Sequence, residues 1–105
     1  MGSVSETAPP LAEMFETCIG CKWTLVVLGH VRNGVNRPGA IERATPGLTA
    51  KVLTERLVKL VAFGILQKQS YPEIPPRVEY TLTPFGERFM AILDQIEQLK
   101  AEFGG

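Results

Sequence analysis

The feature that most constrains the fold is a pair of short alternating runs separated by a proline-rich pentapeptide. Residues 65–71 read ILQKQSY, residues 77–83 read RVEYTLT, and PEIPP lies between them. In the second run Val78, Tyr80 and Leu82 alternate with polar residues, which is the period of a half-buried strand. Prolines would remove hydrogen bonds from a central strand. The pentapeptide therefore predicts an extended loop at the tip of a hairpin.

Four helices are predicted before this hairpin. Residues 11–19 repeat apolar side chains at helical spacing, and a second amphipathic stretch that starts near Lys22 is closed by Asn33-Gly34. Pro38 suits the first position of a short third helix that runs to about Ala44. Helices therefore dominate the part of the chain that precedes the hairpin.

The fourth helix has clear boundaries, because Thr49 is a good N-cap and Gly64 is a good C-terminal stop. Its helical spacing predicts an apolar face that is buried. That face consists of Leu53, Leu57, Leu60 and Val61. Lys51, Glu55 and Lys59 lie opposite, with Thr54 on one flank and Arg56 on the other. A mixed polar face is thus expected to look outward.

A fifth helix follows the hairpin, since Thr83-Pro84 offers an N-cap followed by a proline at the first helical position. Its apolar residues alternate at spacings of four and three, which is a heptad seam. A helix of ~20 residues is roughly 30 Å long, and this length favours packing on a second subunit over packing only on its own core. The expected interface residues from the first and last helices are Leu11, Met14, Phe15, Phe89, Ile92, Ile96, Leu99 and Phe103.

Length and composition bound the class of protein. A chain of 105 residues predicts a single domain, which we expect over residues 10–105 behind a flexible polar tail at residues 1–9. The net charge is zero, so only charge gathered on one face can indicate a charged partner. No apolar run spans a membrane and the N-terminus has no signal-peptide pattern, so we expect no membrane contact. Two cysteines without an export signal indicate the reducing cytoplasm.

Three stretches together resemble the HxlR-type transcription regulators, winged-helix proteins related to the MarR group. They are GCKWTLVVL at residues 20–28, TAKVLTERLVKLVAFGIL at 49–66 and PPRVEYTLTPFG at 75–86. The resemblance implies an α+β, mostly α, winged helix-turn-helix fold with a two-stranded wing and dimerisation helices at both ends. It also implies a homodimer that binds double-stranded operator DNA and regulates transcription.

In such proteins the second helix of the motif enters the major groove with its N-terminal residues at base edges. The resemblance places that helix after Thr49, so Lys51 and Thr54 are expected at bases and the N-terminus of the helix at a phosphate. Arg77 on the hairpin suits a narrow minor groove. The remaining cations are expected at phosphates. The full expected DNA-contacting set is Arg37, Thr49, Lys51, Thr54, Arg56, Lys59, Lys68 and Arg77.

Cys18 and Cys21 are the only cysteines. With His30, the only histidine, they supply three metal ligands where structural zinc needs four, so no metal site is expected. Cys21 replaces the second glycine of the family's Gly-Gly-Lys-Trp text and follows the apolar stripe that contains Cys18. Its position beside Lys22 and near a helix start favours a low thiol pKa. Two interpretations stay open: packing residues, or a thiol switch whose oxidation weakens operator binding.

An enzyme is not expected. A lone His30 without an orienting partner is a weak case for nucleophilic catalysis, and no glycine-rich phosphate loop follows a strand. No cofactor is predicted, and the sequence indicates no small-molecule effector. The alternative function is a winged-helix module that binds protein without specific DNA recognition, which zero net charge and the outward Glu55 would suit.

Overall fold

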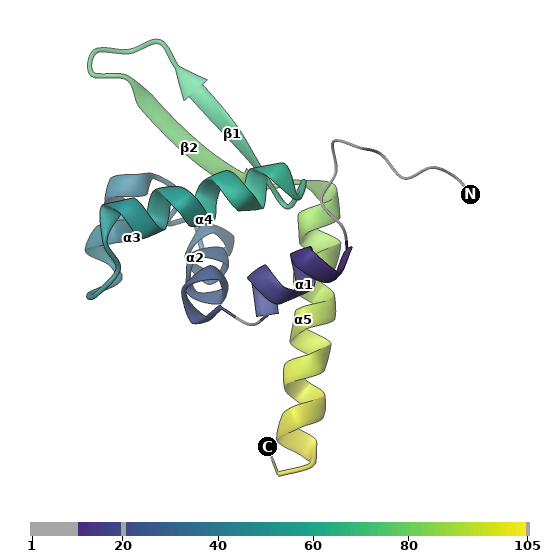
Figure 1. The fold of residues 1–105 in the computed structure, drawn as a ribbon. Coiled ribbons are helices and arrows are strands. Elements are labelled where there is room, and N and C mark those ends of the chain that lie inside the picture. The colour runs from purple at the N-terminus through teal and green to yellow at the C-terminus, as the bar shows by residue number, and fades with distance from the viewer. Residues whose placement is uncertain (1–10, 20, 105) are drawn as a thin grey trace.

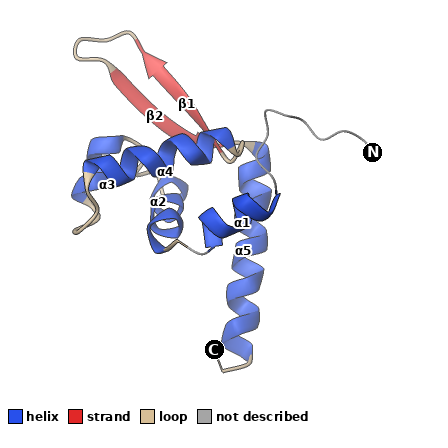
Figure 2. Ribbon diagram, viewed as in Figure 1, coloured by secondary structure: helices blue, strands red, loops and turns tan. Residues whose placement is uncertain are grey.

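The computed structural model describes residues 11–19 and 21–104 (Figure 1). The order of elements is four helices, two strands and a final helix, as the sequence predicts (Figure 2). The elements are α1 (Leu11–Ile19), α2 (Lys22–Arg32), α3 (Pro38–Arg43), α4 (Ala50–Ala62), β1 (Leu66–Tyr71), β2 (Arg77–Leu82) and α5 (Pro84–Glu102). The expected tail at residues 1–9 and the expected helix stop at Gly20 lie outside the described residues.

The helix boundaries follow local chemistry. The Thr49 hydroxyl accepts a hydrogen bond from the Val52 N–H at 3.2 Å and caps α4. Thr83 caps α5 in the same way, accepting from the Gly86 N–H at 2.8 Å. Gly64 ends α4 with a φ of +81°, a conformation that a residue with a Cβ rarely adopts. The predicted caps and stops are therefore confirmed.

Strands β1 and β2 form a two-stranded antiparallel wing, with Leu66 opposite Leu82 and Tyr71 opposite Arg77. The wing is joined to the helices at its base, where the Tyr80 N–H donates to the Asn36 carbonyl at 2.9 Å. Its other end projects beyond the helices on the side of α3 and α4 (Figure 1). Residues 72–76 form the loop at this tip, as predicted.

The core lies where α2, α3 and α4 meet the base of the wing. Leu28, Ile41, Leu60 and Ile65 are fully buried there. The expected buried face of α4 is correct for Leu53, Leu57 and Leu60, but the prediction for Val61 is wrong, because this residue is 38% exposed. The buried stripe is narrow and Val61 lies at its edge.

Helix α5 starts under the wing and its C-terminal half extends away from the other elements (Figure 1). Its first half packs through Phe89, Met90 and Leu93, which are buried. The Arg32 guanidinium holds the Asp94 carboxylate with two hydrogen bonds, one of 3.0 Å, and so fixes the end of α2 to α5. The helix that the sequence assigns to a dimer interface is therefore rigidly joined to the helix-turn-helix body.

Candidate nucleic-acid interface

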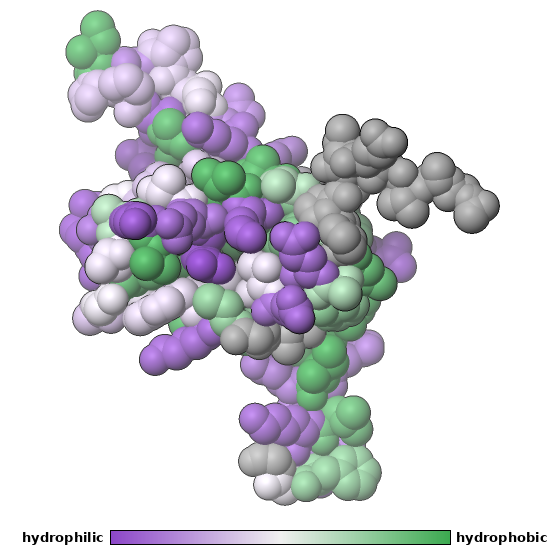
Figure 3. Space-filling view, in the orientation of Figure 1, coloured by the Kyte–Doolittle hydropathy of each residue, from purple (hydrophilic) through white to green (hydrophobic). Residues whose placement is uncertain are grey.

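The N-terminal half of α4 presents a polar, outward face. Thr49, Lys51 and Thr54 are exposed, and hydrophilic surface covers this helix in the space-filling view (Figure 3). The described residues form no ion pair with Lys51, so its ammonium is free to donate to a base or a phosphate. Lys51 and Thr54 are the side chains that the resemblance places at base edges.

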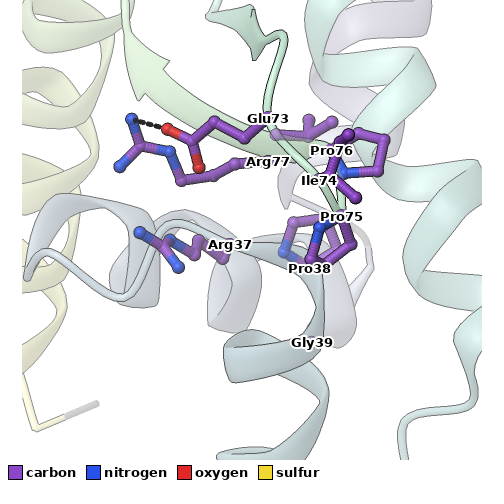
Figure 4. Close-up of a pocket in the computed structure, with 9 residues that line it drawn as sticks. Arg37, Pro38, Gly39, Glu73, Ile74, Pro75, Pro76 and Arg77 are labelled. Atoms are coloured by element: carbon purple, nitrogen blue, oxygen red, sulfur yellow. Dashed lines mark ion pairs between the residues drawn. The ribbon is translucent and has the colours of Figure 1, made fainter.

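The wing and α3 border an open groove of about 540 Å³ beside this helix (Figure 4). Pro75 at the wing tip and Pro38 at the start of α3 both line it, as does Arg37. The Arg37 side chain is 54% exposed and its Nε lies 3.5 Å from a Glu79 oxygen. Lys68 is exposed on β1. Arg37 and the tip of the wing thus line one groove, and α4 packs against both α3 and β1.

Arg77 is held more firmly than a free tip cation would be. One of its terminal nitrogens lies 3.0 Å from Glu73 (Figure 4). The other lies 3.5 Å from Glu79, and the guanidinium sits 3.9 Å over the Tyr71 ring. The side chain is only 30% exposed. This clamp follows from the register, which sets Tyr71 directly opposite Arg77.

Glu79 is a residue that the sequence reasoning missed. One of its carboxylate oxygens lies 3.5 Å from both Arg37 and Arg77, so it links the wing to the start of α3. A signal for it was present in the sequence. Glu79 is two residues from Arg77 on one strand, so both side chains lie on the same face of the hairpin.

Two of the expected phosphate-contacting cations of α4 lie elsewhere. The Lys59 ammonium is 3.8 Å from the Glu13 carboxylate of α1, near the opposite end of the helix. Arg56 is half-buried, and its Nε is buried without a hydrogen-bond partner among the described residues. Lys59 lies about two helical turns further along α4 than Lys51, and Arg56 lies on a different side of the helix from Lys51 and Thr54. Their DNA contacts stay predictions, with less support than those of Lys51.

The two cysteines have different surroundings. Cys18 is completely buried, and burial followed by the proximity of Cys21 raises its pKa to about 11. Cys21 is half-buried at the N-cap of α2. Its burial raises the pKa, but the Thr24 N–H and hydroxyl, the Trp23 N–H and the Arg56 charge outweigh it, so the pKa of Cys21 is lowered. The accessible, more acidic thiol is therefore Cys21.

The Thr24 hydroxyl is a potential hydrogen-bond donor to the Cys21 sulfur. Thr24 is completely buried, yet its oxygen has no hydrogen-bond partner of standard geometry within the described part of the chain. A thiolate at Cys21 would accept from this hydroxyl, because Thr24 lies one helical turn further along. The site therefore favours a charged sulfur beside Arg56, a residue of α4.

An apolar stripe remains uncovered along α5 (Figure 3). Ile92 is 51% exposed, Leu99 57% and Phe103 81%. Phe85 and Ile96 extend the stripe, and Leu11 and Phe15 of α1 are also exposed. The expected interface residues Met14 and Phe89 instead lie in the chain's own core, because α1 packs on the first half of α5, with the Phe15 and Phe89 rings 6.3 Å apart.

Residues 11–19 and 21–104 offer neither a metal-binding cluster nor a helix that could cross a membrane. No group of three or more His, Cys, Asp and Glu side chains in these ranges is arranged to hold a metal ion. None of their helices combines the length and apolar character that a membrane crossing requires. The side chains available for function there are the polar face of α4, the wing with Arg37, the Cys21 thiol and the apolar stripe of α5.

Comparison with known proteins gives one consistent result. A model described as HxlR-like helix-turn-helix matches residues 18–105. The helix-turn-helix-type transcriptional regulator YtcD of Bacillus subtilis is 38% identical over 74% of this chain and 62% of its own length. The chain spans about three fifths of the length of the first curated relatives it matches, with shares of 62%, 61% and 60%.

Two solved structures are similar over nearly their whole length. A MarR-family transcriptional regulator from Enterococcus faecalis has a TM-score of 0.77 at 33% identity, covering 96% of this chain and 94% of its own. The redox regulator HypR in its oxidised form has a TM-score of 0.73 at 33% identity, covering 87% and 94%. The winged-helix architecture is thereby confirmed.

Proposed function

The chain belongs to the HxlR-like helix-turn-helix family, and from this premise we propose that it is a homodimeric transcription regulator that binds operator DNA sequence-specifically. One observation carries the proposal. The exposed N-terminal half of α4 offers Lys51 and Thr54, and α4 packs against both β1 of the wing and α3, which follows Arg37. This arrangement supports α4 as the helix that reads the major groove. A protein that acts on chromosomal DNA would work in the cytoplasm.

The exposed stripe of α5 supports a homodimer. Isolated apolar side chains on a surface are common, but a contiguous row at heptad spacing is typical of a helix that packs on a partner. A second copy offers the same row, and a two-fold axis would bring the two rows together. Such a dimer would present two α4 helices to two operator half-sites.

Replacing Lys51 with alanine tests the reading role of α4. We expect affinity for the operator to fall about 10-fold or more, because a good base contact is worth roughly 1–3 kcal/mol and the dimer makes it twice. Affinity for unrelated DNA should fall much less. The measurement is a gel shift on the DNA upstream of the protein's own gene, with the contacted bases located by footprinting.

Lys100→Ala is the matched control for the loss of charge, since Lys100 lies in the last turn of α5, and sedimentation velocity verifies that this variant keeps the oligomeric state of the wild type. Its operator affinity should stay near that of the wild type. DNA binding that is undetectable even at low salt, where phosphate contacts are strongest, would contradict the proposal. That result would favour a winged-helix module that binds protein.

We further propose that chemistry at the Cys21 thiol modulates DNA binding. Similarity to a protein titled redox regulator supports this, and so does the position of Cys21 near Arg56 of α4. Modification would replace a thiolate, which attracts the Arg56 guanidinium, by a larger neutral group. Because Arg56 belongs to α4, the helix that would read DNA, the loss of this attraction would lower the affinity for the operator.

Alkylation rates test the ranking of the two thiols. We expect Cys21 to react with iodoacetamide at neutral pH at least ~100-fold faster than Cys18. A pKa raised to about 11 lowers the thiolate fraction of Cys18 about 100-fold below that of an ordinary thiol, whereas the pKa of Cys21 is lowered. Mass spectrometry of peptides after timed quenching measures both rates in one sample. Alkylated wild type should bind the operator more weakly, whereas Cys21→Ser should be unaffected by the reagent. Equal operator affinity before and after complete alkylation of Cys21 would contradict the modulation.

A further inference from the structure

The tip of the wing is apolar and carries no cation. Its loop consists of Pro72, Glu73, Ile74, Pro75 and Pro76. Ile74 is fully exposed, at 101%, and hydrophobic surface is visible at the end of the wing (Figure 3). Three prolines restrict the backbone on both sides of it, so little conformational entropy would be lost when the loop meets a partner.

The cation expected to read the minor groove is already engaged. To reach DNA, Arg77 would have to leave Glu73, Glu79 and the Tyr71 ring together. Glu73 would then face the phosphates without a counter-charge, and Glu79 would keep only Arg37. Held as it is, Arg77 instead neutralises Glu73, and this removes the charge that would otherwise repel DNA from the tip.

The surroundings of the tip indicate what it meets. The tip and the start of α3 border one groove, in which Arg37 is the more exposed of the two arginines (Figure 4). The wing projects beyond the helices on the side of α3 and α4 (Figure 1), and Lys51 is exposed in the first turn of α4. DNA seated on α4 in its major groove would continue past Arg37, where a phosphate can bind, and bring the adjacent minor groove to Ile74.

We propose that Ile74 enters the minor groove beside the α4 site as an apolar wedge, backed by Pro75 and Pro76, with Arg77 positioning the loop. The inference rests on the proposed DNA-binding function and adds a second reading element to it. Branched apolar side chains and prolines are the residues that widen a minor groove or part a base step. Pyrimidine–purine steps such as TA deform most easily, so the wedge selects operators with such a step at the wing position.

The decisive experiment changes the minor groove without changing the major groove. Hydroxyl-radical footprinting first locates the bases protected by the wing. Adenine there is then replaced by 2,6-diaminopurine, which adds an amino group to the minor-groove floor and leaves the major-groove edge intact. We expect wild-type affinity to fall about 5- to 10-fold, the cost typical of one unfavourable base pair. Ile74→Ala should bind the natural operator about 5-fold more weakly and show less than a 2-fold further effect of the diaminopurine.

Ser70→Ala provides the control, because Ser70 is exposed on β1 outside the tip. It should respond to diaminopurine as the wild type does. Thermal melting verifies that Ile74→Ala folds normally, as expected for a side chain without burial.

If Ile74→Ala binds both DNAs like the wild type, the wedge is overturned while the DNA-binding function stands. If Ile74→Ala lowers only the binding of a partner protein, the tip is a protein contact and the wedge is likewise overturned. Failure of the wild type to bind any DNA would overturn the proposed function itself.

Discussion

Replacing Ile96 with aspartate is expected to convert the proposed dimer into monomers. Operator binding should weaken by at least ~100-fold, because linked binding to two half-sites contributes roughly 10²- to 10⁴-fold over one. Ile96 lies in the exposed apolar row of α5, between Ile92 and Leu99. In a two-fold dimer each substitution is present twice, close to the axis. Burying an unpaired carboxylate costs several kcal/mol, so two of them exceed what such an interface can tolerate.

Gln98→Asp supplies the matched control for this substitution. It adds the same charge two residues later, on the opposite face of α5 from the apolar row. Sedimentation velocity should report a dimer for this variant and a monomer for Ile96→Asp, with gel shifts on the same samples. A dimeric Ile96→Asp protein would place the interface elsewhere and leave the exposed row of α5 unexplained.

The sequence predicts the elements of this fold well because their determinants are local. Thr49 and Thr83 cap helices through hydrogen bonds to groups three residues away. The loop at the hairpin tip follows from its own prolines, and strand β2 follows from the alternation of its own residues. Fold class could therefore be predicted from spacing and caps, and the family resemblance added how the elements are arranged.

The candidate site is less predictable because it depends on which elements meet. Arg77 is expected at a free tip, yet Tyr71 and Glu79 hold it, and these contacts follow from the strand register. The charge of Arg56 lowers the pKa of Cys21, which is 35 positions earlier in the chain. Single-residue chemistry identifies cations, but only tertiary packing decides which of them remain available to a partner.

The burial of the apolar residues is also difficult to predict from the sequence, because it depends on which elements pack together. Periodicity assigns Phe89 and Leu99 to one seam, and they do lie on one side of α5. However, Phe89 is buried within the chain and Leu99 is 57% exposed. The difference arises because α1 covers only the first half of α5. A heptad row of apolar residues predicts a helix face that packs on another surface. The length of α1, which covers part of this face, decides how much of it remains exposed to a second copy of the chain.

Gly86→Ala is expected to destabilise the protein by about 3 kcal/mol, the upper part of the usual range for forced overpacking. Gly86 lies in the first turn of α5 and is buried against the base of the wing. A Cβ on it would overlap the Ile65 carbonyl oxygen and lie 3.0 Å from the carbonyl carbon. Both are backbone atoms, so the clash cannot be relieved by rotating a side chain.

The clash would also pull apart the junction between the wing and α5. The Thr83 N–H donates to the same Ile65 carbonyl at 3.0 Å, and the Thr83 hydroxyl caps α5 through Gly86. Moving α5 away would weaken both hydrogen bonds. It would also change the direction of α5, the helix that we assign to the dimer interface. Reduced operator binding should therefore accompany the loss of stability, even at temperatures where Gly86→Ala is folded.

Thermal unfolding followed by circular dichroism measures this effect, and a loss of about 3 kcal/mol corresponds to a Tm lower by roughly 10–20 °C for a domain of this size. Gly29→Ala is the control, because a Cβ at this position in α2 meets no atom within 4 Å. Alanine there should be neutral or stabilising by up to about 1 kcal/mol, since it lowers the entropy of the unfolded chain. If both variants melt within a degree or two of the wild type, α5 can shift freely at its start. A junction that loose could not hold two α4 helices at a fixed spacing for an operator.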